Sequence, residues 1–209
     1  MIINFLSEKS GKFGLLKVSG DPVNPFELRQ GNPHKTFKSG VSILEVLKVP
    51  YYVSAGTALG IIRDKNFIPH DNDLDVELIT SYEKPINIEK IKYSFSKKGF
   101  TLIRTVFDGE YPKQLAFLSK GNIVFDLWFV YTDVEEDFVV TYSEHGKMKT
   151  PLSMVTNLKS KEWEIGEVKY NIILPNQPEE YCEMRYGKDW NIPKTSKGPW
   201  QEDAGNLEK

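Results

Sequence analysis

The feature that most constrains this chain is a short acidic run that continues directly into an apolar one, Asp71-Asn72-Asp73-Leu74-Asp75-Val76-Glu77-Leu78-Ile79. Alternating acidic and apolar residues are typical of a β-strand, because side chains two positions apart point to the same face of a strand. Asp73 and Asp75 would therefore share a face, with Cα atoms about 6.5 Å apart. Two carboxylates at that spacing can bind one hard divalent cation or a close pair of cations. The sequence thus predicts a strand that carries a metal site.

A possible phosphate-binding turn precedes the acidic strand. The β-prone run Tyr51 to Ser54 ends in Gly56-Thr57, and a short helix is expected over residues 58–63. A glycine lets the backbone approach a ligand closely, so that backbone N–H groups of this turn can contact a phosphate. The hydroxyl of Thr57 could donate to the same phosphate or could cap the helix. We expect Gly56 and Thr57 to bind phosphate beside the metal.

A third carboxylate, Asp126, is the single charge in the apolar strand expected over residues 123–130. An unpaired buried carboxylate is costly, so Asp126 needs a cation or strong hydrogen bonds. If the two strands are neighbours, Asp73, Asp75 and Asp126 can bind one metal ion, with Asp71 as a further candidate ligand. A solvent-exposed Asp126 at a strand end, or one that pairs with an arginine, is the alternative that residue types leave open.

Composition excludes several classes of protein. The 209 residues, 40% of them apolar, suffice for one domain with a small appendage and a sizeable core. A net charge of -2 gives no general case for nucleic-acid binding. The single cysteine, Cys182, excludes an internal disulfide framework and fits a reducing compartment. We find neither a signal peptide nor an apolar run near the about 20 residues of a transmembrane helix, and we expect a cytoplasmic protein.

The rest of the chain alternates expected helices and strands, which indicates an α+β or α/β fold with a mixed sheet. Residues 21–35 are predicted to form a loop, because they are rich in Pro, Gly and Asn. Lys113 and Gln114, near Tyr111-Pro112, could face the substrate, but the prediction is that they lie in a solvated loop. Helices are expected over 37–47 and 88–98 and from Asn176 to Gly187, and strands over 100–107, 114–118, 123–130, 138–142, 147–150 and 164–173.

The expected division of the chain is simple. Residues 1–36 form a β-prone extension of unknown function, residues 37–193 form the domain, and residues 194–209 form a C-terminal tail.

Two separated blocks of this sequence resemble the LicD family. The first block runs from Gly56-Thr57-Ala58-Leu59-Gly60-Ile61-Ile62-Arg63 to Phe67-Ile68-Pro69-His70-Asp71-Asn72-Asp73-Leu74-Asp75 and is similar to the family pattern GTLLGxxR followed by IPWDDDID. The second block, Tyr181 to Trp190 with Pro193 after it, is similar to YLxxxYGxxWxxP. Two blocks in the right order make the match specific, and they bracket about two-thirds of the chain.

The resemblance implies a nucleotidyltransferase (polymerase-β-like) core, with a mixed sheet flanked by helices and Mg²⁺, or alternatively Mn²⁺, held by Asp73, Asp75 and Asp126. It implies a CDP-activated alcohol donor, such as CDP-choline or CDP-ribitol, and a sugar hydroxyl of a glycan or lipid-linked precursor as acceptor. Arg63 matches the arginine of the pattern and is expected to clamp a phosphate. Its alternative role is to satisfy carbonyl groups at the helix end.

Two departures from the family pattern bear on the substrate. His70 replaces a tryptophan, and Asn72 replaces an aspartate that would face away from Asp71, Asp73 and Asp75. A calcium loop is excluded, because Val76 and Tyr82 stand where that motif needs Gly and Glu. Two other functions stay open at this point: a nucleotidyltransferase with an NTP donor, and a non-catalytic nucleotide- or glycan-binding protein.

Overall fold

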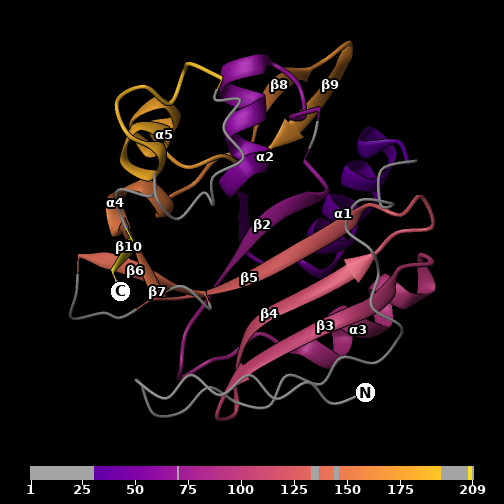
Figure 1. The fold of residues 1–209 in the computed structure, drawn as a ribbon. Coiled ribbons are helices and arrows are strands. Elements are labelled where there is room, and N and C mark those ends of the chain that lie inside the picture. Colours follow the sequence, from indigo (N-terminus) through magenta and orange to yellow (C-terminus); the bar gives the residue numbers. More distant parts are fainter. Residues whose placement is uncertain (1–30, 70, 133–136, 144–145, 194–206, 209) are drawn as a thin grey trace.

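The computed structural model describes residues 31–69, 71–132, 137–143, 146–193 and 207–208 (Figure 1). Most of the expected N-terminal extension and C-terminal tail, together with His70, lies outside these residues. None of the described helices is both long and apolar enough to cross a membrane. The elements, in chain order, are α1 (Pro33–Leu47), β1 (Tyr51–Val53), α2 (Ala55–Leu59), η1 (Gly60–Asp64), β2 (Asp73–Thr80), α3 (Ile88–Lys97), β3 (Thr101–Asp108), β4 (Tyr111–Leu118), β5 (Val124–Thr132), β6 (Phe138–Ser143), β7 (Gly146–Pro151), α4 (Leu152–Val155), β8 (Lys161–Ile165), β9 (Val168–Ile172), α5 (Pro178–Tyr186) and β10 (Leu207–Glu208).

The centre of the fold is a mixed eight-stranded sheet with the path β1-β2-β5-β6-β7-β10. β2 and β5 pair in parallel, whereas the other pairs are antiparallel. β4 and β6 share one edge of β5: β4 pairs with its first half and β6 with Tyr131 and Thr132. β3 then pairs with β4. The acidic strand β2 therefore lies next to the strand that carries Asp126, as the sequence predicts.

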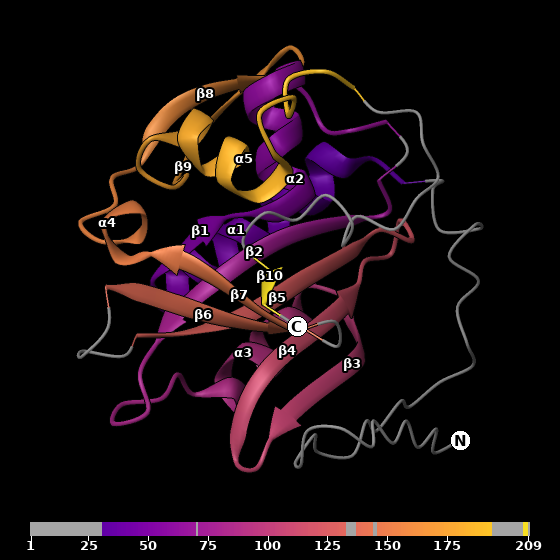
Figure 2. The same cartoon turned by 60° about the vertical axis from the view of Figure 1, so that its left-hand side comes forward.

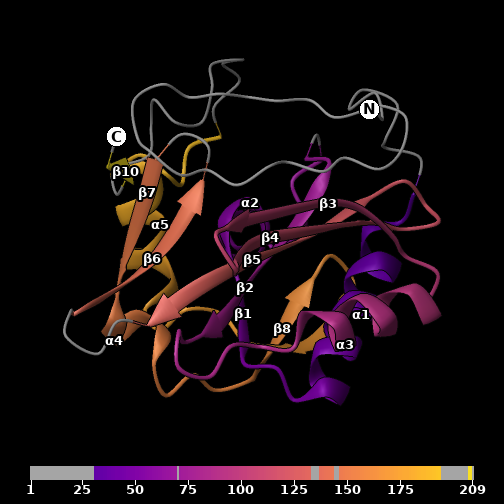
Figure 3. The ribbon, with the colours of Figure 1, turned by 90° about the horizontal axis from the view of Figure 1, so that it is seen from below.

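Helices α1 and α3 cover one face of the sheet, and they lie side by side below it in Figure 3. On α1, a Cβ built at Gly40 would collide with the ring of Phe125, so the helix backbone packs directly on β5. On α3, the ring of Phe95 stacks on Phe117 of β4 with centroids 4.3 Å apart. We call this the core face, because its side chains are apolar.

The opposite face, which we call the site face, carries the acidic residues. In Figure 2, α2, α5 and the β8–β9 hairpin gather over its β1–β2 end. α2 packs on β2, and α5 packs on α2. The hairpin is tied to the main sheet where the N–H of Val53 donates to the carbonyl of Ile173. The site face of β2 is thus buried under these elements.

Several element boundaries differ from the expectations. α1 begins at Pro33 rather than at residue 37, so the loop predicted over residues 21–35 is wrong for residues 33–35. Asn32 caps the helix, and proline suits the first helical position. The run 164–173 is not one strand but the hairpin β8–β9, which turns at Gly166 with φ of 61°. The short helix expected over residues 58–63 begins earlier, at Ala55, so that Gly56 and Thr57 form its first turn, and it continues as the π-helical η1. The predicted loop at Lys113 and Gln114 is wrong, since both are buried in β4.

Candidate metal and phosphate site

Three carboxylates converge on the site face. Asp75 and Asp126 are direct partners in the parallel β2–β5 register, so their side chains lie next to each other on one face. Asp73 lies two residues before Asp75 on that same face. One carboxylate oxygen from each of the three lies within 4.8 Å of the other two. Oxygens at these separations can bind one hard cation.

The carboxylates are held in a poorly solvated setting. Asp75 is 8% exposed and Asp126 is 6% exposed. Burial raises the pKa of Asp75 well above its usual value, with repulsion from Asp73, Asp71 and Asp126 adding to the effect. Burial, followed by repulsion from Asp73, raises the pKa of Asp126 to about 7. Ionised carboxylates are therefore disfavoured here without a nearby positive charge, and a divalent cation would provide it.

The Gly56-Thr57 turn, which is the first turn of α2, lies directly beside these carboxylates. A Cβ built on Gly56 would lie 2.5 Å from Oδ2 of Asp71, so only glycine leaves room for that carboxylate. The hydroxyl of Thr57 accepts a hydrogen bond from the N–H of Asp75 at 2.7 Å, which fixes the turn to β2. Ser54, the N-cap residue, makes no side-chain cap hydrogen bond to the first turn. The N–H groups of Gly56 and Thr57 therefore lack the cap that usually satisfies a helix N-terminus.

Two further side chains orient the carboxylates. Nε2 of Gln114 donates to both oxygens of Asp126, at 2.8 and 2.7 Å. Nε1 of Trp128 donates to Oδ1 of Asp75 at 3.4 Å. Gln114 and Trp128 are cross-strand partners on the site face, two residues along the strands from the pair Ala116 and Asp126. Both therefore help to fix the carboxylate positions, and neither was singled out for this role from the sequence.

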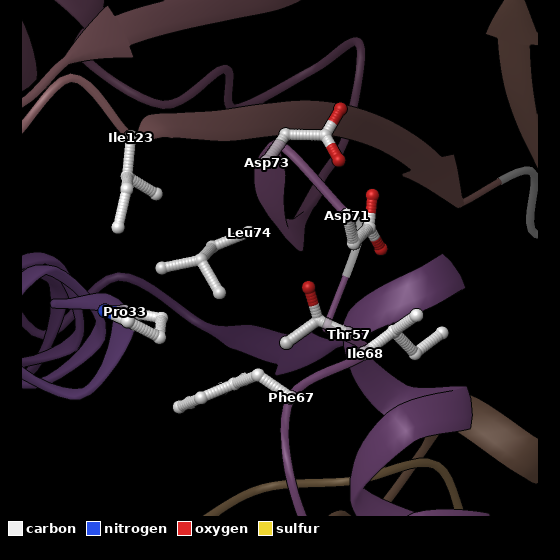
Figure 4. A pocket seen from close by; sticks show the side chains of 8 residues that line it. All are labelled: Pro33, Thr57, Phe67, Ile68, Asp71, Asp73, Leu74 and Ile123. Atoms are coloured by element: carbon white, nitrogen blue, oxygen red, sulfur yellow. The ribbon is translucent and has the colours of Figure 1, made fainter. Parts of the chain in front are cut away.

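A small pocket lies beside the turn (Figure 4). Its polar side is formed by the oxygens of Thr57, Asp71 and Asp73. The rest of its lining is apolar and comes from α1, the loop before β2, and the starts of β2 and β5: Pro33, Phe67, Ile68, Leu74 and Ile123. The carboxylates thus have an apolar wall on one side, which limits their solvation further.

Comparison with known proteins identifies the domain. Residues 48–170 match the family model described as LicD/FKTN/FKRP, nucleotidyltransferase domain. The chain belongs to the LicD family. The matched range includes the turn, the acidic strand and Asp126, and it ends before the second sequence block in α5.

Curated relatives of this LicD chain include ribitol-5-phosphate transferase FKTN from Macaca fascicularis and from Homo sapiens. Each is 28% identical over 167 residues, which is 79% of this chain and 34% of the relative. The chain therefore spans about a third of the length of these relatives. A solved structure of the lincosamide antibiotic adenylyltransferase LnuA, bound to lincomycin, aligns at 12% identity with a TM-score of 0.46, covering 73% of this chain and 85% of that one.

The arginine of the first LicD block does not join the carboxylates. Nε and Nη2 of Arg63 donate to Oδ1 and Oδ2 of its neighbour Asp64, both at 2.8 Å. In the structure Arg63 thus binds a neighbouring carboxylate, which is neither of its two predicted roles, a phosphate clamp and a partner for helix carbonyls. A role for Arg63 in phosphate binding stays a prediction.

Residues of the second LicD block, in α5, contact the backbone at the start of α2. The hydroxyl of Tyr181 accepts hydrogen bonds from the N–H of Ala55, at 3.2 Å, and from Nη1 of Arg185, at 3.3 Å. Nη1 of Arg185 also lies 3.6 Å from Oε1 of Glu77, and Tyr52 donates its hydroxyl to the same carboxylate. These four buried side chains link α5, the turn, β2 and β1.

Sequence reasoning missed this buried network, although one signal was available. Glu77 is a lone charge in the apolar end of β2, and Asp126 was singled out in β5 by the same criterion. The matching cation, Arg185, could not be paired with Glu77 from the sequence, because the two residues are 108 positions apart and no local pattern indicates that they are in contact. Tyr181, which also belongs to this network, is completely buried.

Proposed function

We propose that this chain transfers a phospho-alcohol group, such as ribitol phosphate or phosphocholine, from a CDP-linked donor to a sugar hydroxyl of a glycan or glycan precursor. The observation that supports it most is the convergence of Asp73, Asp75 and Asp126 beside the uncapped Gly56-Thr57 turn. Membership in the LicD family and the similarity to proteins named ribitol-5-phosphate transferase point to the same chemistry.

In this proposal Asp73, Asp75 and Asp126 hold Mg²⁺ or Mn²⁺. The bound ion would supply positive charge for the diphosphate of the donor. The N–H groups of Gly56 and Thr57 would donate to phosphate oxygens, as uncapped helix N-termini commonly do. Gln114 and Trp128 would keep the carboxylates in place, and Asp126, on the side away from the turn, would accept the proton of the incoming hydroxyl.

A thermal-shift screen tests the proposal with CDP-ribitol, CDP-choline, CTP and ATP, each with and without Mg²⁺ or Mn²⁺. A ligand that binds only the folded chain raises the melting temperature by mass action. We expect a metal-dependent rise with a CDP-alcohol, and we expect it to disappear in the double variant Asp73→Asn, Asp75→Asn. The absence of a shift with every nucleotide would count against the proposal.

The family description, which names a nucleotidyltransferase domain, favours one alternative: transfer of a nucleoside monophosphate from an NTP to a small molecule. Turnover separates the two reactions, because the alternative releases pyrophosphate from CTP or ATP and the proposed reaction releases CMP from a CDP-alcohol. A metal-dependent binding protein without catalysis would give the thermal shift and neither product.

A further inference from the structure

A second pocket lies away from the carboxylates, where η1, β8 and the start of α5 meet. Its volume is about 250 Å³, close to the lower end of the roughly 300 to 1,000 Å³ that is usual for small-molecule sites. In Figure 1 the coil formed by α2 and η1 rises from the sheet, with α5 and the β8–β9 hairpin beside it. Gly56 and Lys65 are nine residues apart along this coil, which corresponds to roughly 13 Å along its axis. The pocket, at the Lys65 end, is therefore separate from the metal site, at the Gly56 end.

The apolar part of the pocket lining is formed by Ile62, Trp163 and Pro178. Ile62 is only 6% exposed, so it forms the base of the pocket, whereas Trp163 and Pro178 are half-buried. A half-buried indole offers a large, rigid apolar surface against which the C–H groups of a ligand can pack. Small-molecule sites commonly combine such a surface with a few polar groups.

One cation already lies against the indole. Nζ of Lys65 lies 5.6 Å from the centre of the Trp163 ring, and it donates a hydrogen bond to the carbonyl of Ile62 at 3.0 Å. Both contacts hold the ammonium group at the pocket. A second cation in the pocket would be repelled by this charge, so a cationic ligand is disfavoured even though an indole alone would suit one.

Two carboxylates line the same pocket from α5. Glu179 and Glu180 stand in the first turn of this helix, and Nε2 of Gln177 donates to Oε2 of Glu180 at 2.9 Å. These carboxylates outnumber the ammonium of Lys65, so an anionic ligand is disfavoured as well. Carboxylate oxygens accept hydrogen bonds from hydroxyl groups, and the ammonium group donates them. The pocket therefore suits a neutral ligand with several hydroxyl groups and an apolar face.

We propose that this pocket binds one uncharged sugar residue, with the C–H groups of the ring packed on Trp163 and with hydroxyl groups hydrogen-bonded to Lys65 and Glu179. A pyranose has the required combination, because its hydroxyl groups surround the ring while its faces carry C–H groups. The inference goes beyond the proposed transfer reaction and does not depend on it, since it needs neither the donor nor the metal. The pocket gives the chain a contact with a glycan apart from the metal site.

The test follows the indole N–H signals of the four tryptophans of the full chain by two-dimensional NMR in EDTA, with each signal assigned through a Trp→Phe variant. The probes are glucose, galactose and N-acetylglucosamine, together with glucosamine and glucuronate as charged analogues of glucose. We expect at least one neutral sugar to shift the Trp163 signal, and the charged analogues to bind more weakly than glucose. Trp163→Ala should weaken the binding of that neutral sugar at least about tenfold.

Three further variants separate binding from folding. Trp163→Tyr keeps an aromatic face and should retain part of the affinity, even if Trp163→Ala does not fold. Glu179→Gln should weaken binding about threefold, because an amide oxygen is a weaker acceptor than a carboxylate. Its matched control is Glu183→Gln, an exposed residue one turn further along α5 and outside the pocket lining, which should bind like the wild-type chain.

The proposal would be overturned if none of the neutral sugars shifted the Trp163 signal, or if a charged analogue bound more tightly than glucose. Unchanged affinity in both Trp163→Tyr and Glu179→Gln would overturn it as well. A shift of the Trp128 signal without one at Trp163 would place the sugar at the carboxylates instead and would count as the same failure. Failure of the donor proposal shows separately, as the absence of a nucleotide-dependent thermal shift.

Discussion

The two faces of β2 and β5 are built from the same strands but carry opposite chemistry. On the core face, Leu74, Val76 and Leu78 lie beside Phe125, Leu127 and Phe129, all buried. On the site face, the alternate positions carry carboxylates and an indole: Asp73, Asp75, Glu77, Asp126 and Trp128. Both faces of these strands are covered, but the core-face side chains named here are all apolar, whereas the site face combines the buried apolar Val130 with buried carboxylates. The core face therefore provides mainly stability, whereas the site face also carries the groups suited to chemistry.

The comparison also shows two ways of keeping a buried carboxylate. Glu77 has a permanent cation and a hydrogen-bond donor in Arg185 and Tyr52. Asp75 and Asp126 receive hydrogen bonds from Trp128 and Gln114, but their pKa values are still raised. A carboxylate that forms an ion pair within the chain, such as Glu77, has a structural role. A buried carboxylate without such an ion pair is suited to bind a metal ion.

The largest effect on stability is expected on the core face. Phe125→Ala should lower the free energy of unfolding by about 4 kcal/mol, because it leaves a cavity between β5 and the backbone of α1 at Gly40. Urea denaturation measures the loss. The matched control is the next residue, Asp126→Asn, which should leave the metal-free chain as stable as before or more stable. Equal losses in both variants would contradict the division between the faces.

A smaller loss is expected where the carboxylate has its own cation. Arg185→Gln leaves Glu77 buried without its positive partner and should cost about 3 kcal/mol. Adding Glu77→Gln should restore much of that loss, because the double variant has no buried charge. Denaturant unfolding of the two single variants and the double variant gives the coupling energy. Additive losses would show that Arg185 does not serve Glu77.

Much of the site could be predicted from the sequence because it depends on local patterns. The alternation of Asp73 and Asp75 with apolar residues gives the strand and its face, and the lone charge in β5 gives Asp126. The pairing of these two strands was a hypothesis that the parallel register confirms. The mixed sheet flanked by helices is confirmed as well. Roles in catalysis and phosphate binding stay predictions.

The features that sequence could not provide depend on register and on distant contacts. The predicted solvated loop at Lys113 and Gln114 is wrong because β4 begins earlier than the expected strand, at Tyr111, with Pro112 at an irregularity where it pairs with Phe107. A register shift between β3 and β4, after Leu102, decides which face of the sheet Arg104 belongs to, and no local sequence pattern marks it. The start of α1 was missed for a different reason, since the Asn32-Pro33 signal was present but the surrounding Gly, Pro and Asn suggested a loop.

The smallest effect concerns protons on the site face. Burial raises the pKa of Asp126 to about 7, against about 4 for an unfolded chain, so folding favours the protonated form. Its contribution to stability is complete below about pH 4 and is lost as the pH rises towards 7. Between pH 5 and pH 7 the free energy of unfolding of the metal-free chain should therefore fall by about 2 kcal/mol more than that of Asp126→Asn.

Over the same range the stabilisation by Mg²⁺ should grow, because protons compete with the metal for these carboxylates. Thermal unfolding of both proteins across this range, with EDTA or with Mg²⁺, measures the two slopes, and parallel curves in EDTA would show that Asp126 keeps its charge without help from a cation.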